Sequence, residues 1–70
     1  MIPLAYAVPG EINTVKKVGG SAEIKKHLED MGVVVGGNVT VVSSLSGNII
    51  VNIKNSRIAI SEEMAKRIMV

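Results

Sequence analysis

The sequence predicts a mainly β fold: a small five-stranded barrel with one inserted α-helix and a short helical turn before the last strand. Runs of β-branched residues, bounded by glycine, asparagine and serine, are typical of short strands. One amphipathic segment at residues 21–31 has helical spacing and interrupts these runs. The 70 residues are 47% hydrophobic and include no Phe or Trp, which favours a single small core of valine and isoleucine.

The first strand is expected at residues 11–18, where the alternation of polar and apolar residues is imperfect and a bulge is expected. The helix begins at Ser21, because its hydroxyl can accept a backbone N–H of the first turn. Ile24, Leu28 and Met31 recur at helical spacing and predict one apolar face.

A glycine stop and a hairpin follow this helix. Gly32 is expected to take the left-handed conformation that ends many helices. Gly36-Gly37 then forms a turn. Strands at residues 39–44 and 48–53 are expected to pair as a hairpin across Leu45-Ser46-Gly47.

The last third of the chain predicts the remaining strands. A tight turn at residues 55–56 leads into a strand at 57–60, and Ser61 starts a short helical turn. Residues 67–70 are expected to form the fifth strand and to be buried in the sheet. Five short strands with one helix after the first describe an SH3-like barrel, a single domain over residues 1–70.

Composition also bears on location. The chain has no cysteine, which excludes a disulfide scaffold and a thiolate metal site and suits the cytoplasm. Residues 1–9 are apolar but lack a basic leading region and contain two prolines, so they predict a segment packed against the barrel rather than a signal peptide. No run approaches the roughly 20 apolar residues that span a bilayer. We therefore expect a cytoplasmic protein that is not inserted in a membrane.

The joint order of these elements resembles the FeoA-domain family, small bacterial proteins that accompany the ferrous-iron transporter FeoB. The matching residues are Pro9-Gly10, Gly19-Gly20, Leu28, Met31-Gly32, Gly36, Gly47, Arg57 to Ile60, Ala65, Ile68 and Val70. The resemblance covers nearly the whole chain. It implies the same SH3-like barrel and a role beside a membrane transporter.

Residues for catalysis are nearly absent from the sequence. With no cysteine and one histidine, a nucleophile–histidine–acid arrangement would have to centre on His27, and Ser21 nearby is already interpreted as a helix cap. Neither Gly19-Gly20 nor Gly36-Gly37 is followed by the lysine and hydroxyl of a phosphate-binding loop. The sequence therefore predicts a protein that is not an enzyme.

Metal binding needs separate treatment because the resemblance is to iron transport. His27 and Asp30 are three residues apart on one helix and Glu23 lies one turn earlier, so a helical surface site is geometrically possible. Ligands from one exposed helix form no cage. We interpret His27 as a half-buried, hydrogen-bonded residue and expect no bound cofactor. Fe(II) or another divalent transition metal is implied by the resemblance alone.

Nucleic-acid binding is not expected. The net charge is +2 and the pI about 9.2, but Lys16-Lys17, Lys25-Lys26 and Lys66-Arg67 are scattered pairs rather than a stripe. Tyr6 is the only aromatic residue, whereas proteins that bind single strands use several aromatic stacking platforms. The basic pairs are interpreted as solvated faces or as a rim for an acidic partner.

Apolar residues in turns suggest a surface for a protein partner. Val33, Val34 and Val35 follow the helix, and Leu45 lies at the hairpin tip, where polar residues are usual. We predict that these four residues contact a partner. In the alternative interpretation, the valines fold back over the mouth of the barrel.

Two functional hypotheses follow from the resemblance. In the first, the chain is a non-enzymatic accessory protein of ferrous-iron uptake that docks on the cytoplasmic GTP-binding domain of a FeoB-like transporter. In the second, it is a metal-responsive regulatory module, similar to the SH3-like C-terminal domain of iron-dependent repressors. Those repressors carry a DNA-binding domain upstream. Because the 70-residue sequence has no such domain, we favour the first hypothesis.

Overall fold

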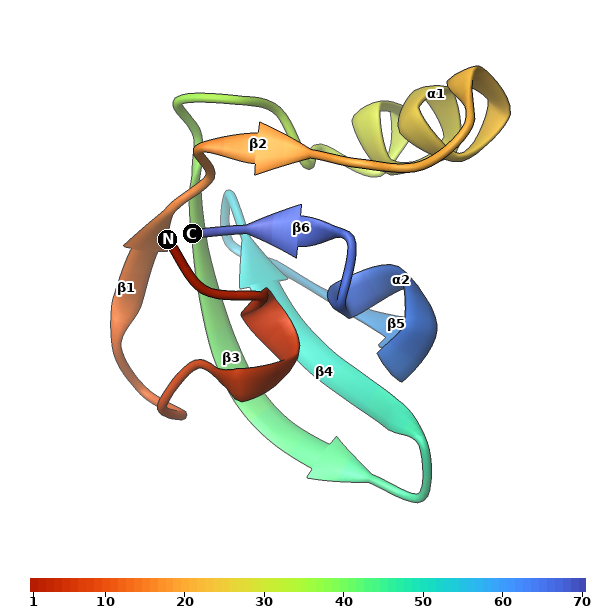
Figure 1. Ribbon diagram of the computed structural model, residues 1–70. Helices are drawn as coiled ribbons and strands as arrows, with labels where there is room; N and C mark the ends of the chain where they lie inside the picture. Colours follow the sequence, from red (N-terminus) through yellow and green to blue (C-terminus); the bar gives the residue numbers. More distant parts are fainter.

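The computed structural model describes residues 1–70. Its elements in chain order are η1 (Leu4–Tyr6), β1 (Ile12–Thr14), β2 (Lys17–Val18), α1 (Ala22–Asp30), β3 (Asn38–Leu45), β4 (Asn48–Ile53), β5 (Ser56–Ser61), α2 (Glu62–Ala65) and β6 (Ile68–Met69). Figure 1 shows α1 standing to one side of the strands, with α2 just before the last strand. The mainly β fold, the inserted helix and the late helical turn are confirmed.

The six strands form two antiparallel sheets and do not close into the five-stranded barrel that the sequence predicts. One has four strands in the order β1-β3-β4-β5, and the other pairs β2 with β6. The prediction of one strand over residues 11–18 was therefore wrong, because this segment forms two strands with different partners. Val15 lies between these strands and is only 2% exposed. It is buried at the point where the chain leaves the four-stranded sheet for the two-stranded sheet. The imperfect alternation, from which a bulge was expected, falls at this break.

Two-residue turns join β3 to β4 and β4 to β5. Ser46 and Gly47 have φ values of 44° and 83°, as the predicted hairpin requires. The second turn uses Lys54 and Asn55, with φ of 49° and 68°, one residue earlier than predicted. Asparagine tolerates positive φ because its short polar side chain can bond locally, so Asn55 belongs in the turn and Ser56 begins β5.

Helix α1 begins and ends where the sequence predicts. The Ser21 Oγ accepts a hydrogen bond from the Ile24 N–H at 3.3 Å, and Gly32 follows the helix with φ of +98°. Leu28 is the one residue of α1 that is fully buried, while Ile24 and Met31 pack partly against the core. The helix is therefore attached to the protein mainly through one side chain near its C-terminal end.

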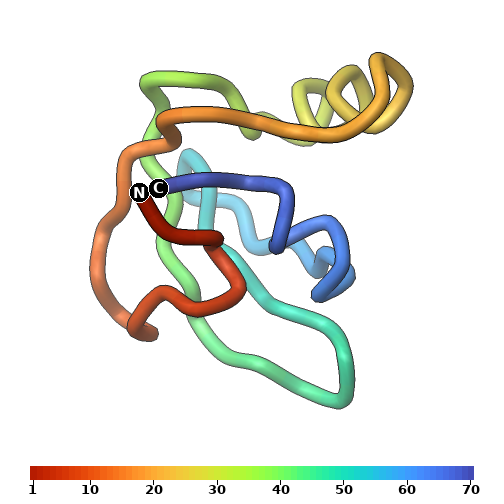
Figure 2. The backbone as a smooth tube through the Cα atoms, in the orientation of Figure 1, coloured from red at the N-terminus to blue at the C-terminus, as the bar shows by residue number.

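The core contains 14 buried hydrophobic residues drawn from almost every element: Leu4, Ala7, Val15, Leu28, Val33, Val39, Val41, Ile49, Val51, Ile53, Ile60, Ala65, Ile68 and Val70. The N-terminal segment packs on the sheets as predicted. Ile2 and Val70 exchange two backbone hydrogen bonds of 2.9 and 2.8 Å. Figure 2 shows the two ends of the chain side by side. The predicted burial of the last residues is also confirmed.

Gly32→Val is predicted to lower the free energy of unfolding by more than about 1 kcal/mol, because φ of +98° strains a branched residue. A Cβ at this position would also lie 3.2 Å from Ile53 Cγ2. Gly36→Val is the control, since Gly36 has φ of +89° but nothing within 4 Å of an added Cβ. Urea denaturation should show the larger loss for Gly32→Val. Equal midpoints for Gly32→Val and the unmodified protein would contradict the observed helix end.

Candidate functional site

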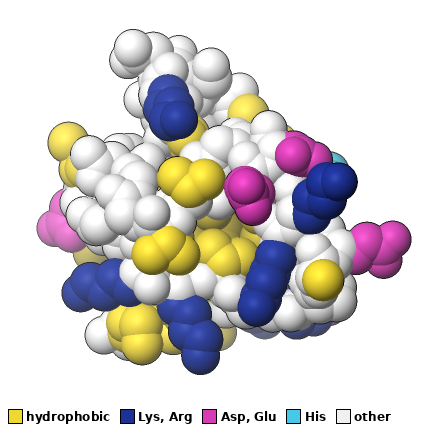
Figure 3. All heavy atoms as spheres, turned by 90° about the horizontal axis from the view of Figure 1, so that it is seen from above, with side chains coloured by type: hydrophobic (Ala, Val, Ile, Leu, Met, Phe, Trp, Pro, Cys, Tyr) yellow, Lys and Arg dark blue, Asp and Glu magenta, His cyan; other side chains and the backbone are white.

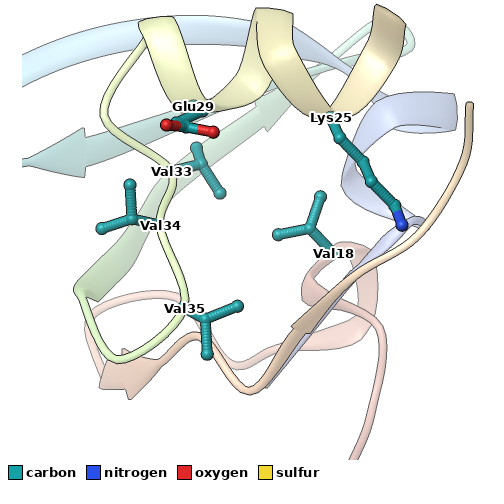
Figure 4. A pocket seen from close by; sticks show the side chains of 6 residues that line it. All are labelled: Val18, Lys25, Glu29, Val33, Val34 and Val35. Carbon is teal, nitrogen blue, oxygen red and sulfur yellow. The ribbon is translucent and has the colours of Figure 1, made fainter. Parts of the chain in front are cut away.

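An open groove lies between α1, β2 and the loop that follows α1, and its lining is mainly valine. Val18, Val33, Val34 and Val35 form the apolar part, with Lys25 and Glu29 of α1 above them (Figure 4). Its volume is about 390 Å³, within the range of sites that hold small ligands or a few side chains. We call this site the valine groove.

Backbone hydrogen bonds fix the loop that forms one wall of the groove. The Val33 N–H donates to the Leu28 carbonyl at 2.9 Å, which holds the start of the loop against the end of α1. Val15 exchanges two hydrogen bonds with the glycine turn, donating to Gly37 O at 2.9 Å and accepting from Gly36 N–H at 2.8 Å. Both ends of the loop are thus tied to buried residues, and the groove is formed without a partner.

The three predicted valines lie together but differ in exposure. Val33 is only 3% exposed and belongs to the core, so for this residue the alternative, folding back over the barrel, is what the structure shows. Val34 is half-buried and Val35 is 67% exposed. Leu45 is 69% exposed at the end of β3 and does not line the groove. The structure therefore brings Val34 and Val35 to one open surface and leaves Leu45 elsewhere.

The sequence analysis missed three residues that line the groove. Val18 was placed within a single long strand, Lys25 was interpreted as part of a solvated face or of a rim for an acidic partner, and Glu29 was not singled out. The two charged residues are four apart on α1, a spacing that places them on the same side of a helix. Figure 4 shows Lys25 and Glu29 at opposite ends of the apolar part. The groove therefore has an apolar floor and one charge of each sign on its rim.

The surface around the groove has the same mixed character. Figure 3 looks onto the end of the molecule that carries β2 and α1. Hydrophobic side chains gather in a hollow near the middle of this face, and basic and acidic side chains surround them. Exposed apolar surface with a charged rim is typical of a site that binds another protein.

Comparison with known proteins identifies the family. The model of the FeoA domain matches residues 2–70. The chain belongs to the FeoA family. This family is associated with ferrous-iron transport as an accessory component. A protein named as an Fe(2+) transport protein A in Methanocaldococcus jannaschii is 37% identical over 70 residues, which cover 100% of this FeoA chain and 85% of that protein.

Solved structures agree with this assignment. A crystal structure described as an iron uptake regulatory protein (FeoA) has a TM-score of 0.90 and 32% identity, covering 99% of this FeoA chain and 92% of the other. Iron(II) transport protein A from Clostridium thermocellum has a TM-score of 0.88 and 27% identity, covering 97% and 43%. A manganese-dependent transcriptional repressor shares only the fold, with a TM-score of 0.85, 17% identity and coverage of 94% and 38%.

The candidate metal ligands of this FeoA protein all lie on the outside of α1. Glu23, His27 and Asp30 are exposed, and no hydrogen bond holds their side chains. The interpretation of His27 as half-buried and hydrogen-bonded was wrong, because Leu28 takes the inward position at this turn of the helix. The structure contains no group of three or more His, Cys, Asp or Glu side chains positioned to hold a metal ion.

We predict that this FeoA protein has no tight Fe(II) site of its own. Three exposed ligands on one helix leave the ion largely hydrated and lack residues that would orient the ligands. Anaerobic calorimetry should therefore show no stoichiometric binding at micromolar Fe(II), with His27→Ala indistinguishable from the unmodified protein. Micromolar or tighter binding that disappears in His27→Ala would contradict this prediction.

No helix in this FeoA protein is both long and apolar enough to cross a membrane. The longest, α1, has nine residues and a single buried side chain. Apart from Ala22 and the half-buried Ile24, its other residues are polar or charged, and two of them, Lys25 and Glu29, line the valine groove. The helix therefore serves as one wall of the candidate site.

Proposed function

We propose that this protein is a non-enzymatic, cytoplasmic accessory protein of ferrous-iron uptake, and that its valine groove docks on the cytoplasmic GTP-binding domain of a FeoB-like transporter. One observation carries the proposal most directly. The half-buried Val34 and the exposed Val35 line a preformed, open apolar groove, in a member of a family associated with ferrous-iron transport. In this proposal the protein modulates the transporter and catalyses no reaction of its own.

The shape of the groove supports docking by a protein segment. An apolar side chain of the transporter domain would remove Val18, Val34 and Val35 from water, at about 25 cal/mol per Å² of apolar surface buried. Because the loop is already held by hydrogen bonds to Val15, little conformational freedom is lost on binding. A preformed site loses less conformational entropy on binding than a flexible loop does.

The charges on the rim support a fixed orientation of the partner. Lys25 and Glu29 lie at opposite ends of the apolar floor. A docked segment with an acidic group near Lys25 and a basic group near Glu29 would be favoured over the reversed orientation. Complementary charges of this kind contribute to specificity and to the association rate more than to affinity. They also give the interaction a measurable dependence on salt.

The experiment replaces Val34 and Leu45 with serine, singly, and measures pull-down of the cognate FeoB cytoplasmic domain together with thermal stability. Both residues lie outside the fully buried core, so both variants are expected to fold. Val34→Ser should weaken binding, since it removes apolar surface from the groove. Leu45→Ser is the matched control, because it removes an exposed apolar side chain that does not line the groove.

The other outcomes are informative. Loss of binding in Leu45→Ser alone would move the docking surface to the hairpin tip and overturn the groove proposal. Normal binding in both variants would favour the basic residues as contacts, and binding should then weaken steeply with added salt. If neither the variants nor the unmodified protein binds the transporter domain, the proposed function is wrong.

A further inference from the structure

A second hollow, with a volume of about 340 Å³, lies on the other side of β2 from the valine groove. Its lining includes the basic side chains of Lys17, Lys66 and Arg67, the bare backbone of Gly19 and Gly20, and two methionines. No carboxylate lines it. We call it the basic hollow.

Strand pairing between β2 and β6 creates this cluster from residues far apart in the sequence. Lys17 lies opposite Met69, and the Gly19 N–H donates to the Arg67 carbonyl at 2.7 Å. Because side chains alternate along a strand, Lys17 and Arg67 lie on one face of the β2–β6 pair, while Val18 lies on the other. Lys17, from one of the basic pairs that look scattered in the sequence, thus meets both members of the Lys66-Arg67 pair.

Two of the three cations of the hollow form long ion pairs with acidic residues that lie outside its lining. Glu62 Oε1 lies 3.7 Å from Lys66 Nζ, and Glu63 Oε1 lies 3.6 Å from Arg67 Nη2. The Glu63 side chain is 82% exposed, so its attraction to Arg67 is weakened by water. Exposed pairs at these distances are long for charge-assisted hydrogen bonds, which are normally about 2.7–2.9 Å. The donors of Arg67 remain free for a ligand.

The Arg67 side chain passes close over the backbone of Gly20. A Cβ on Gly20 would lie 3.3 Å from Arg67 Cδ and 3.4 Å from Arg67 Nη1, so the arginine side chain lies directly across this glycine. Gly20 also has φ of +104°, which disfavours any other residue. The arginine is the least exposed cation of the two ion pairs, with 37% of its side chain open to solvent. The most directional donor of the hollow is therefore less exposed than the neighbouring Lys66.

We propose that the basic hollow binds a phosphate-class oxyanion, independently of the valine groove. Three cations without a lining carboxylate match a ligand of two or more negative charges better than a single carboxylate. The planar guanidinium of Arg67 pairs with two oxygens of one phosphate, and the lysines act as point charges. Such an anion comes either from a small soluble phosphate compound or from the headgroup of an anionic lipid.

The test uses inorganic pyrophosphate as the soluble probe. Pyrophosphate is titrated into the protein and binding is monitored in ¹H–¹⁵N spectra. The Gly19 and Gly20 amide signals are expected to shift until the site is saturated. Lys17→Gln and Arg67→Gln should each weaken binding by about tenfold or more, the usual scale for losing one charge-assisted hydrogen bond. Lys16→Gln and Arg57→Gln remove the same charge outside the hollow and should change the affinity by less than about twofold. Thermal unfolding shows which variants fold. If Arg67→Gln does not fold, Lys17→Gln alone tests the proposal.

A second arm identifies the source of the anion. Co-sedimentation with phosphatidylcholine vesicles, with and without phosphatidic acid, is performed on the same variants. Binding only to the phosphatidic-acid vesicles, with the same loss in Lys17→Gln, would support the hollow and assign it to a lipid headgroup. Saturable pyrophosphate binding alone would assign it to a soluble phosphate. The proposal is overturned if neither probe binds, or if Lys16→Gln weakens binding as much as Lys17→Gln.

Discussion

Leu28→Ala is expected to lower the free energy of unfolding by about 2–5 kcal/mol, as for other large-to-small changes in a core. Leu28 is fully buried and is the only residue of α1 that belongs to the core. Its carbonyl also accepts a hydrogen bond from the N–H of Val33, the residue that starts one wall of the valine groove. The truncation should therefore leave a cavity and loosen α1, which forms one wall of the groove. In a 70-residue domain of modest stability, this loss approaches the total.

The control is Lys26→Ala, an exposed position on the same helix. Alanine is a better helix former than lysine, so this variant should change stability by no more than about 0.5 kcal/mol. Urea denaturation gives both values, and circular dichroism reports the helix separately. Equal stability of Leu28→Ala and Lys26→Ala would mean that α1 contributes little to the core, contrary to the observed burial.

Val35→Asp is expected to weaken binding to the cognate FeoB cytoplasmic domain by about 30-fold or more, the effect of losing a central interface residue. Val35 is 67% exposed, so an aspartate there is solvated in the free protein and the melting temperature should hardly change. In the complex, the same carboxylate would be buried in a valine-lined groove without a partner. Burying an unpaired charge is costly, which makes this change more severe than Val34→Ser.

Leu45→Asp provides the matched comparison, since it places the same charge at an equally exposed apolar residue outside the groove. Calorimetry at fixed salt measures both affinities. Comparable losses in Val35→Asp and Leu45→Asp would show that added negative charge alone disrupts binding. Full binding by Val35→Asp would exclude its side chain from the interface.

Strong local signals made most of the fold predictable. Ser21 and Gly32 mark the ends of α1 because capping and left-handed termination depend on neighbouring residues alone. The β3–β4 hairpin follows from the short turn at Ser46-Gly47, which suits positive φ. The break at Val15 could not be predicted in this way. It depends on β2 pairing with β6, which lies at the far end of the chain.

The candidate site was predictable only in part, for a related reason. The run of valines after α1 indicated an apolar surface, but which valine faces inward depends on the hydrogen bond between Val33 and Leu28. Lys25 and Glu29 carry no signal of their own, because charges on a helix are usually solvated. The basic hollow depends on the same β2–β6 pairing that the sequence does not specify locally. In each case the missing information is a contact between distant segments.

Methyl-resolved NMR of the complex can locate the surface that docks on the transporter domain. The protein is labelled on its valine and leucine methyl groups and titrated with the unlabelled cytoplasmic domain of the cognate FeoB. If the valine groove is the docking site, the methyl signals of Val18, Val34 and Val35 shift or broaden first, while those of Leu45 and the buried Val51 remain in place. Shifts confined to Leu45 and the β3–β4 hairpin, or no shifts at all, would contradict docking through the valine groove.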